Sequence, residues 1–385
     1  MNLFEHVVNI KVFGVGGAGG NAINRMIRDR VTGISYVAVN TDAQALDESL
    51  ADRRLQIGKG ITKGLGAGGD PKVGEQAIKE QFKEIQEELE NCDLVFVTAG
   101  LGGGTGSGAA PWIARFAKER DILCVAVVTK PFTFEGARRN RIALQSSEAL
   151  IDNVDTYICV PNEQLVQQLP KGTSMKDSFS EADRILRQGV QGISDIILSP
   201  GLINVDFADV DSVLRGAGRA LLGVGVGVGE QRAKIATSNA VNSPLLETSI
   251  AGARRILVNI SAGRDFSIGE AEEVMDYVMQ FVHPDDGDVF LGHSINENSE
   301  GEVKVTVLAA DLDPEARGPR LDPEVFESSV QRVAAVDQQR EYPSPNREIT
   351  IEEIQSREPE RPAHLDDVEI DIPAYLKQRR SGGRF

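Results

Sequence analysis

The chain has 385 residues, which at about 150 residues per domain predicts two or three domains and at least one large buried core. Its 41 lysines and arginines against 58 aspartates and glutamates give a net charge of −17, which argues against a nucleic-acid-binding protein because such surfaces are usually basic. With 39 glycines, 41% hydrophobic residues and only 5% aromatics, the composition fits an α/β protein better than an aromatic-rich binding module.

Targeting and metal signals are missing from the sequence. The start, MNLFEHVVNIKVFG, has Glu5 where a signal peptide has basic residues, and no apolar run approaches the ~18 residues of a membrane span. The three cysteines (Cys92, Cys124 and Cys159) are too far apart for a zinc knuckle or a disulfide framework, and the four histidines lack metal-ligand spacing. We therefore expect a cytoplasmic protein that contacts membranes only through a partner.

Strand and helix patterns alternate along the first 170 residues. Four apolar runs, each followed by a loop and a helical pattern, read NIKVFGVG, ISYVAVNTD, DLVFVTAG and DILCVAVVTKP. Such alternation predicts a Rossmann-like parallel sheet with helices on both faces. Ligands of such sheets gather at the carboxyl ends of the strands.

The first glycine loop, GVGGAG at 14–19, fits GxGxxG between a strand and a helix. Glycines let backbone N–H groups approach a pyrophosphate, and the positive end of the helix adds to that attraction. Asp42 ends the next strand, at about the offset of a ribose-binding acid. Alone, this pattern predicts a dinucleotide fold, or merely a tight strand-to-helix turn.

Two further glycine loops change this interpretation. GLGAGG at 64–69 and GLGGGTGSG at 100–108 each precede a helical pattern. Several such loops predict backbone donors around a longer phosphate chain, with the Thr105 and Ser107 hydroxyls as further donors. A nucleoside triphosphate fits better than NAD, although GxxxxGK[ST] and NKxD are both absent.

A long helical pattern covers 174–199 and ends at Pro200-Gly201. Further helices and three strand-like runs follow (RILVNIS, DVFLGHSI and VKVTVLAA), which predicts a mixed second domain ending near Ala310. Before them, NVDFADV places Asp206 and Asp209 three residues apart at the start of a helix. This spacing is typical of a helix cap, and equally of carboxylates that position an attacking water.

The composition changes after residue 310. Residues 311–385 hold 8 of the 16 prolines and 3 of the 39 glycines, and few apolar positions cluster before Leu365. We expect a disordered acidic linker at 311–365 and a short docking peptide at 366–385. A frayed end is the alternative interpretation of this tail.

The sequence GGGTGSG at 102–108 matches the tubulin signature. Together with GVGGAGGNAI, NTDAQAL, FEGARR, NVDFADV and DIPAYL, it makes the chain resemble the bacterial FtsZ family of cell-division GTPases, within the tubulin superfamily, from about Asn9 to Ala310 and again in the tail. The resemblance implies a GTP-binding domain at 1–173, a central helix at 174–199, an activation domain at 200–310 and a partner-docking tail.

The resemblance also implies the ligands, which are GTP and GDP with Mg²⁺ carried by the nucleotide. The implied phosphate-binding residues are Gly17, Ala18, Gly19, Gly20, Asn21, Gly104, Thr105 and Gly106. Asn21 and Asp183 would bind guanine beside Phe179, Glu135 and Arg139 would reach the ribose and neighbouring phosphate, and Asn40 and Asn162 would complete the pocket. An aspartate suits guanine because it accepts both N1–H and N2–H, whereas adenine presents an acceptor there.

Geometry places the acids of the 204–209 loop away from this pocket. Some twenty helical residues separate Asp183 from Asp206, which at 1.5 Å per residue is about 30 Å. We therefore expect Asn204, Asp206 and Asp209 of one subunit to act on the nucleotide of the next, in a head-to-tail polymer. The alternatives are an NAD-dependent oxidoreductase and a scaffold that binds nucleotide without hydrolysing it.

The resemblance implies a cellular role as well. Filaments would build the cytokinetic ring at mid-cell, with the chain itself as the main partner. The tail residues Ile372, Pro373, Tyr375 and Leu376 would dock on membrane-anchoring and regulatory division proteins.

Overall fold

A computed structural model describes residues 8–170, 172–198, 201–203, 205–243, 246, 248–296 and 299–312. Asn204, linker residues 313–365 and the tail 366–385 lie outside the described residues. Among the described helices, none is long and apolar enough to cross a membrane. The three cysteines are buried free thiols.

The amino-terminal half is the parallel sheet that the alternating pattern predicts. Its order is β3-β2-β1-β4-β5-β6, and every neighbouring pair is parallel. The strands are β1 (Ile10–Val15), β2 (Ile34–Asn40), β3 (Arg53–Gln56), β4 (Leu94–Gly100), β5 (Leu123–Lys130) and β6 (Thr156–Pro161). β4 is fully buried up to Ala99, as expected of a strand covered on both faces.

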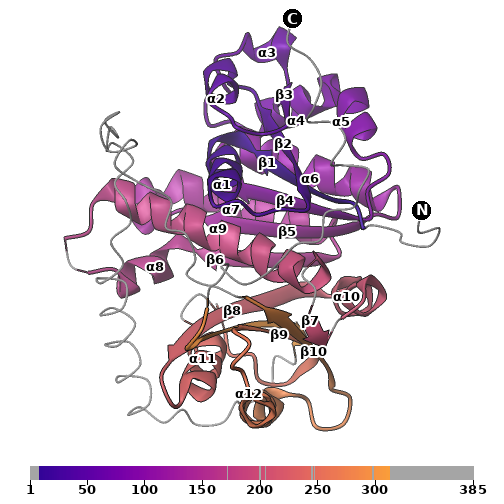
Figure 1. Cartoon of the computed structure of the whole chain (residues 1–385). Coiled ribbons are helices and arrows are strands. Elements are labelled where there is room, and N and C mark those ends of the chain that lie inside the picture. The colour runs from indigo at the N-terminus through magenta and orange to yellow at the C-terminus, as the bar shows by residue number, and fades with distance from the viewer. Residues whose placement is uncertain are drawn as a thin grey trace, which may run out of the picture. The chain divides into compact units, whose positions relative to one another are not determined.

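Helices cover both faces of this sheet (Figure 1). One face packs against α4 (Pro71–Glu80), α5 (Phe82–Glu88), α6 (Thr105–Lys118) and α7 (Ala137–Ile151), and the other against α1 (Gly16–Arg28) and α9 (Met175–Leu198). Short elements complete this half: α2 (Ala43–Asp47), α3 (Lys59–Thr62), the 3₁₀ turn η1 (Thr133–Glu135) and α8 (Asn162–Gln168).

The central helix forms almost where the sequence predicts it. Ser174 precedes α9, and its hydroxyl accepts a hydrogen bond from the N–H of Asp177 at 3.1 Å. Ile185, Leu186, Val190 and Ile193 are buried on one face. Figure 1 shows α9 crossing the molecule between β5 and β8.

The second half is a mixed sheet, also as expected. β8 (Gly218–Val228), β11 (Glu302–Leu312) and β9 (Ala253–Ala262) pair antiparallel, β10 (Asp288–Ile295) runs parallel to β9, and β7 (Gly201–Ile203) closes the edge. Its helical elements are α10 (Phe207–Leu214), α11 (Arg232–Val241), α12 (Ile268–Val278) and the 3₁₀ turn η2 (Met279–Phe281). Three residue pairs between β6 and β8 join both halves into one sheet.

β8 is a strand that the sequence analysis did not predict. Its glycines lie under α11: a Cβ on Gly223 or Gly225 would lie 1.9 or 2.0 Å from a carbonyl oxygen of that helix. The alternating glycines therefore let a helix pack at backbone distance, instead of marking a loop.

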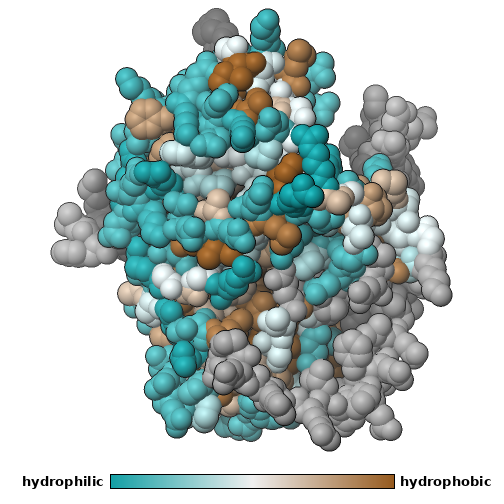
Figure 2. All heavy atoms as spheres, turned by 180° about the vertical axis from the view of Figure 1, so that it is seen from behind, coloured by the Kyte–Doolittle hydropathy of each residue, from teal (hydrophilic) through white to brown (hydrophobic). Residues whose placement is uncertain are grey.

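Figure 2 shows the opposite face of the molecule as mainly hydrophilic, with small separate apolar patches outside the grey atoms.

Candidate functional site

The three glycine loops converge at the carboxyl ends of β1 and β4, which are neighbours in the sheet. A Cβ on Gly16 would lie 3.0 Å from the N–H nitrogen of Gly106, and one on Gly100 would lie 2.7 Å from the Ala18 methyl. Gly104 approaches the second glycine loop, at 64–69: a Cβ on Gly104 would lie 2.8 Å from the Ala67 methyl. Glycine is required for these contacts, because any side chain would separate the loops.

Two helices begin at this junction with free backbone donors. α1 and α6 have no side-chain hydrogen bond at their N-caps and no acidic residue in their first turns, whereas Asp70 caps the nearby α4. The open N–H groups and the positive ends of both helices therefore point to an anion. A Cβ on Gly17, Gly20 or Gly103 would meet nothing within 4 Å, so the loops leave space there.

The hydroxyls near the loops hold them in place. Thr105 and Thr41 share a hydrogen bond of 2.6 Å between buried hydroxyl oxygens. The Ser107 hydroxyl accepts from the N–H of Gly102 at 2.8 Å and is itself buried. We expected Ser107 to face phosphates, but its hydroxyl closes the loop from inside. Thr41, which the sequence analysis missed, follows Asn40 at the end of β2, and its position there was the only available signal.

The packing of α1 on α9 brings a second group together. Asn21 and Arg25 lie one turn apart on α1, and Arg25 donates to the Ser180 carbonyl oxygen of α9 at 3.2 Å. Asp183 follows Ser180 by three residues on the same helix. Burial raises the pKa of Asp183 to about 6, and the positive charge of Arg25 acts against this rise. Arg25 had no sequence signal beyond its spacing from Asn21.

Aromatic residues and an ion pair flank this group. Phe179 of α9 is 39% exposed, and its ring meets the buried Phe132 ring edge-on at 5.1 Å. Glu135 accepts from the N–H of Phe132 at 2.9 Å and forms an ion pair with Arg139. Glu163, a further acid that the sequence analysis did not select, accepts from the N–H of Thr133 at 2.8 Å. Hydrogen bonds from the side chain and backbone of Thr133 lower its pKa.

Two buried asparagines lie at the carboxyl ends of strands of the parallel sheet, Asn40 at the end of β2 and Asn162 directly after β6. The Asn40 side-chain oxygen accepts from the N–H of Asp42 at 3.2 Å, which orients the loop after β2. Asn162, the first residue of α8, is 5% exposed, and its side-chain oxygen is buried without a hydrogen-bond partner among the described residues. Because an unsatisfied buried amide oxygen costs free energy, its position points to a ligand with a donor.

The acids of the 204–209 loop lie elsewhere. Asp206 caps α10: it accepts from the N–H of Asp209 at 2.9 Å, and Asp209 accepts from the N–H of Asp206 at 3.3 Å. Asp183 is followed by fifteen residues of α9, which at 1.5 Å per residue span about 22 Å. The sequence estimate of about 30 Å counted helix up to Asp206, whereas α9 ends at Leu198 and is followed by the strand β7. α8 and α10 lie on opposite sides of Figure 1.

Comparisons with known proteins agree with this geometry. Two family models match the chain: the GTPase domain of the Tubulin/FtsZ family at 9–170 and the C-terminal domain of the FtsZ family at 218–313. An empty FtsZ dimer of M. jannaschii is 43% identical, covers 79% of this chain and 88% of that chain, and has a TM-score of 0.75. CetZ2 of Haloferax volcanii, solved as a GTPγS-bound protofilament, is 24% identical, with coverages of 86% and 99% and a TM-score of 0.68.

The glycine loops, the two uncapped helices and the mixed second sheet thus define a GTPase of the tubulin-like class, with GTP and GDP as ligands. The CetZ2 likeness supports the fold alone. The FtsZ likeness reaches further, because identity and coverage are both high. The chain belongs to the FtsZ family.

Proposed function

We propose that this chain is a self-assembling GTPase whose filaments run head to tail and build the division ring of the cell. Each nucleotide is hydrolysed where two subunits meet, by Asn204, Asp206 and Asp209 of the neighbouring subunit. The observation that carries the proposal is the separation of Asp183 from the acid loop by the remaining length of α9. The empty dimer of the M. jannaschii relative agrees with self-association.

In the proposed pocket, backbone groups of 17–20 and 104–106 bind the phosphates. Asp183 accepts hydrogen bonds from the guanine edge and Asn21 binds the base through its side-chain amide, beside Phe179. Asn40 and Asn162 complete the contacts. Arg139 now pairs with Glu135 and is exposed, so it is free to turn towards the ribose and phosphate. Backbone N–H groups make most of the proposed phosphate contacts, which explains how a chain of net charge −17 would bind a polyanion.

A magnesium ion carried by the nucleotide would neutralise charge on the phosphates during transfer. The described residues contain no group of three or more histidine, cysteine or acidic side chains that could hold a metal. The fit is therefore to a cation bound mainly by phosphate oxygens.

Exposed apolar residues next to both halves of the proposed active site support the head-to-tail contact. Leu65 is 85% exposed in the second glycine loop, and Leu202 of β7 is 77% exposed two residues before Asn204. A head-to-tail interface that joins the two halves of the proposed site would bury both side chains.

The acid loop acts as water-positioning machinery in this proposal. One oxygen of Asp206 and one of Asp209 form the capping pair, so each carboxylate keeps its second oxygen for a water. Cap and catalytic group are therefore compatible roles. If capping were their whole purpose, the chain would be a non-hydrolysing scaffold. An NAD oxidoreductase is disfavoured by the three converging loops, which exceed what a dinucleotide needs.

We retain the division proposed from the sequence: a GTP-binding domain at 1–173, the central helix at 174–199 and an activation domain at 200–310. The linker predicted at 311–365 starts only after Leu312, because Asp311 and Leu312 belong to β11. It tethers the tail at 366–385, where Ile372, Pro373, Tyr375 and Leu376 dock on membrane-bound division proteins. In this arrangement the filament lies at mid-cell in the cytoplasm.

Light scattering and phosphate release, measured after GTP, ATP or NAD is added to the full chain, test the proposal. We expect both signals with GTP alone. Asp209→Ala should keep GTP binding and filaments but lose turnover by at least about 100-fold, the scale of a lost catalytic base. Asp177→Ala, an exposed acid at the start of α9, is the control. Wild-type turnover in Asp209→Ala would establish the scaffold instead.

A further inference from the structure

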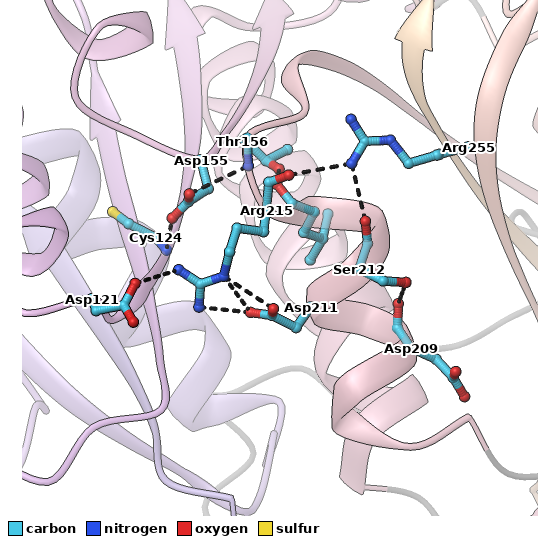
Figure 3. A network of polar contacts seen from close by, with 11 residues as sticks. Asp121, Cys124, Asp155, Thr156, Asp209, Asp211, Ser212, Arg215 and Arg255 are labelled. Carbon is cyan, nitrogen blue, oxygen red and sulfur yellow. Dashed lines mark hydrogen bonds and ion pairs between the residues drawn. The ribbon is translucent and has the colours of Figure 1, made fainter.

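α10 carries the two acids at its first turn and is held at its last turn (Figure 3). Asp206 is the N-cap and Asp209 lies in the first turn, whereas Arg215 is the C-cap. In Figure 3 the Asp209 side chain points away from the cluster of contacts around Arg215. The direction of this helix therefore sets where the acids are presented.

Arg255 of β9 holds the last turn from the second domain. Its Nη1 donates to the carbonyl oxygens of Ser212 and Arg215, at 3.0 and 3.2 Å. These carbonyls have no partner inside a helix that ends here, and a cation at a helix C-terminus is also favoured by the helix dipole. Arg255 thus provides a donor for two backbone carbonyl oxygens and also compensates the partial negative charge at the carboxyl end of α10.

The nucleotide-binding domain holds the same turn from the other side. Asp155 accepts from the N–H of Cys124 at 2.9 Å and from the N–H of Gly216 at 3.3 Å, so it ties the start of β5 to the residue after the helix cap. Arg215 donates to Asp211 within α10 and to Asp121, in the turn before β5, at 3.1 Å.

Two contacts hold the last turn more firmly than the surface pair does: those of Arg255, and a buried hydrogen bond from the Thr156 hydroxyl of β6 to the Leu214 carbonyl oxygen at 2.5 Å. The Arg215–Asp121 pair is 38% and 96% exposed, and such surface pairs contribute little. The Arg255 side chain is only 24% exposed and makes two charge-assisted hydrogen bonds to the helix end. The buried Val210, Val213 and Leu214 pack in a core that includes residues of both domains. The rest of α10 is therefore also held in place.

We propose that Arg255 is a positioning residue for GTP hydrolysis: it fixes the carboxyl end of α10 so that Asp206 and Asp209 enter the neighbouring pocket at a productive angle. The proposal rests on the proposed hydrolysis between subunits. Positioning matters because small displacements of catalytic groups cost large factors in rate. Arg255 itself touches no substrate.

The first test compares Arg255→Gln with Arg254→Gln in the full chain. Both arginines pair with Asp311, at 3.6 and 3.8 Å, but only Arg255 is bonded to α10. We expect Arg255→Gln to lower kcat about 10-fold or more, within the range for misplaced groups. GTP affinity and the assembly threshold should change less than about twofold, and Arg255→Lys should recover part of the rate. Equal turnover in Arg255→Gln and Arg254→Gln would overturn the proposal. So would parallel loss of assembly and turnover.

The second test asks which subunit needs Arg255. In the first mixture, Arg255→Gln carries γ-labelled GTP and excess wild type carries unlabelled GTP, and cleavage of the label is followed for a single turnover. In the second mixture, the wild type carries the label and unlabelled Arg255→Gln is in excess. We expect fast cleavage in the first mixture and slow cleavage in the second. The reverse order would overturn hydrolysis between subunits but leave Arg255 important for turnover. Fast cleavage in both mixtures would overturn the positioning role of Arg255 but not hydrolysis between subunits. If Arg255→Gln does not fold, Arg255→Lys takes its place, because it keeps the charge but loses the fixed geometry of the two hydrogen bonds to the helix end, and slower cleavage is then expected only when the variant is the neighbour of the labelled subunit.

Discussion

At the scale of single residues, the site depends on ionised groups in buried surroundings. Asp183 is the clearest case, because its proposed function as a double acceptor requires the carboxylate, while burial raises its pKa to about 6. The positive charge of Arg25, one helix away, favours the ionised form. Recognition of guanine is therefore expected to depend on pH.

We predict that GTP affinity falls as the pH drops through about 6, since protonated Asp183 can no longer accept both guanine hydrogens. Asp183→Asn should weaken binding about 10- to 100-fold at neutral pH, in line with about 1.5 to 3 kcal/mol for hydrogen bonds to a charged group. Titration calorimetry between pH 5 and 8 measures both effects. Asp177→Asn is the matched control, and an unchanged profile in Asp183→Asn would contradict the prediction.

His293 is a titrating residue outside the nucleotide site. Burial lowers its pKa, both ring nitrogens are buried without a partner among the described residues, and the ring stacks on Phe266 at 5.4 Å. As the pH falls, the unfolded chain takes up this proton before the folded chain does. The contribution to stability is thus complete above about pH 6.5 and lost as the pH falls below it.

His293→Phe should therefore flatten the loss of stability between about pH 6.5 and 5, because phenylalanine keeps the stacking without a titrating group. Urea unfolding midpoints at several pH values measure this difference. His283→Gln, at a half-buried position after η2, should keep the pH dependence of the wild type. The same pH dependence in His293→Phe and wild type would assign the effect to other groups.

At the scale of elements, sequence patterns were informative where the local rule agreed with the tertiary contacts. The 174–199 pattern became α9 at Met175–Leu198, and the glycine loops led into α1, α4 and α6. β8 was missed because its glycines make room for the backbone of α11, which follows later in the chain. Thr41, Arg25 and Glu163 were missed for the same reason: each has its partner on a distant segment. Spacing along one segment cannot supply such pairs.

Gly225→Ala tests the packing of α11 on β8. The added methyl would lie 2.0 Å from the Ala236 carbonyl oxygen, so the helix must shift, at a cost of about 1 to 3 kcal/mol or more. Gly269→Ala in α12 meets nothing within 4 Å and should stabilise by about 0.5 to 1 kcal/mol. Urea unfolding of both variants gives the comparison, and a neutral Gly225→Ala would mean that α11 is not held at this distance.

At the scale of the whole molecule, the central helix separates the two halves of the proposed active site. The nucleotide end has backbone donors and Asp183, and the other end has Asp206, Asp209 and the exposed apolar Leu202. The helix length read from the sequence already predicts that these two ends lie too far apart to meet within one subunit. The structure adds the length of helix between them, from Asp183 to the end of α9 at Leu198.

Leu202→Glu should keep the protein monomeric while leaving its own nucleotide pocket intact. Leu202 is 77% exposed on β7, and a carboxylate there would lose its hydration in an apolar interface. We expect unchanged GTP affinity, no filaments, and phosphate release per subunit at least about 10-fold lower, which no increase in concentration restores because the neighbour's acids never arrive. Leu144→Glu, at a 58% exposed position on α7, adds the same charge elsewhere and should assemble. If sedimentation shows single subunits of Leu202→Glu while phosphate release stays at the wild-type rate, each subunit must complete its own site, and hydrolysis between subunits is wrong.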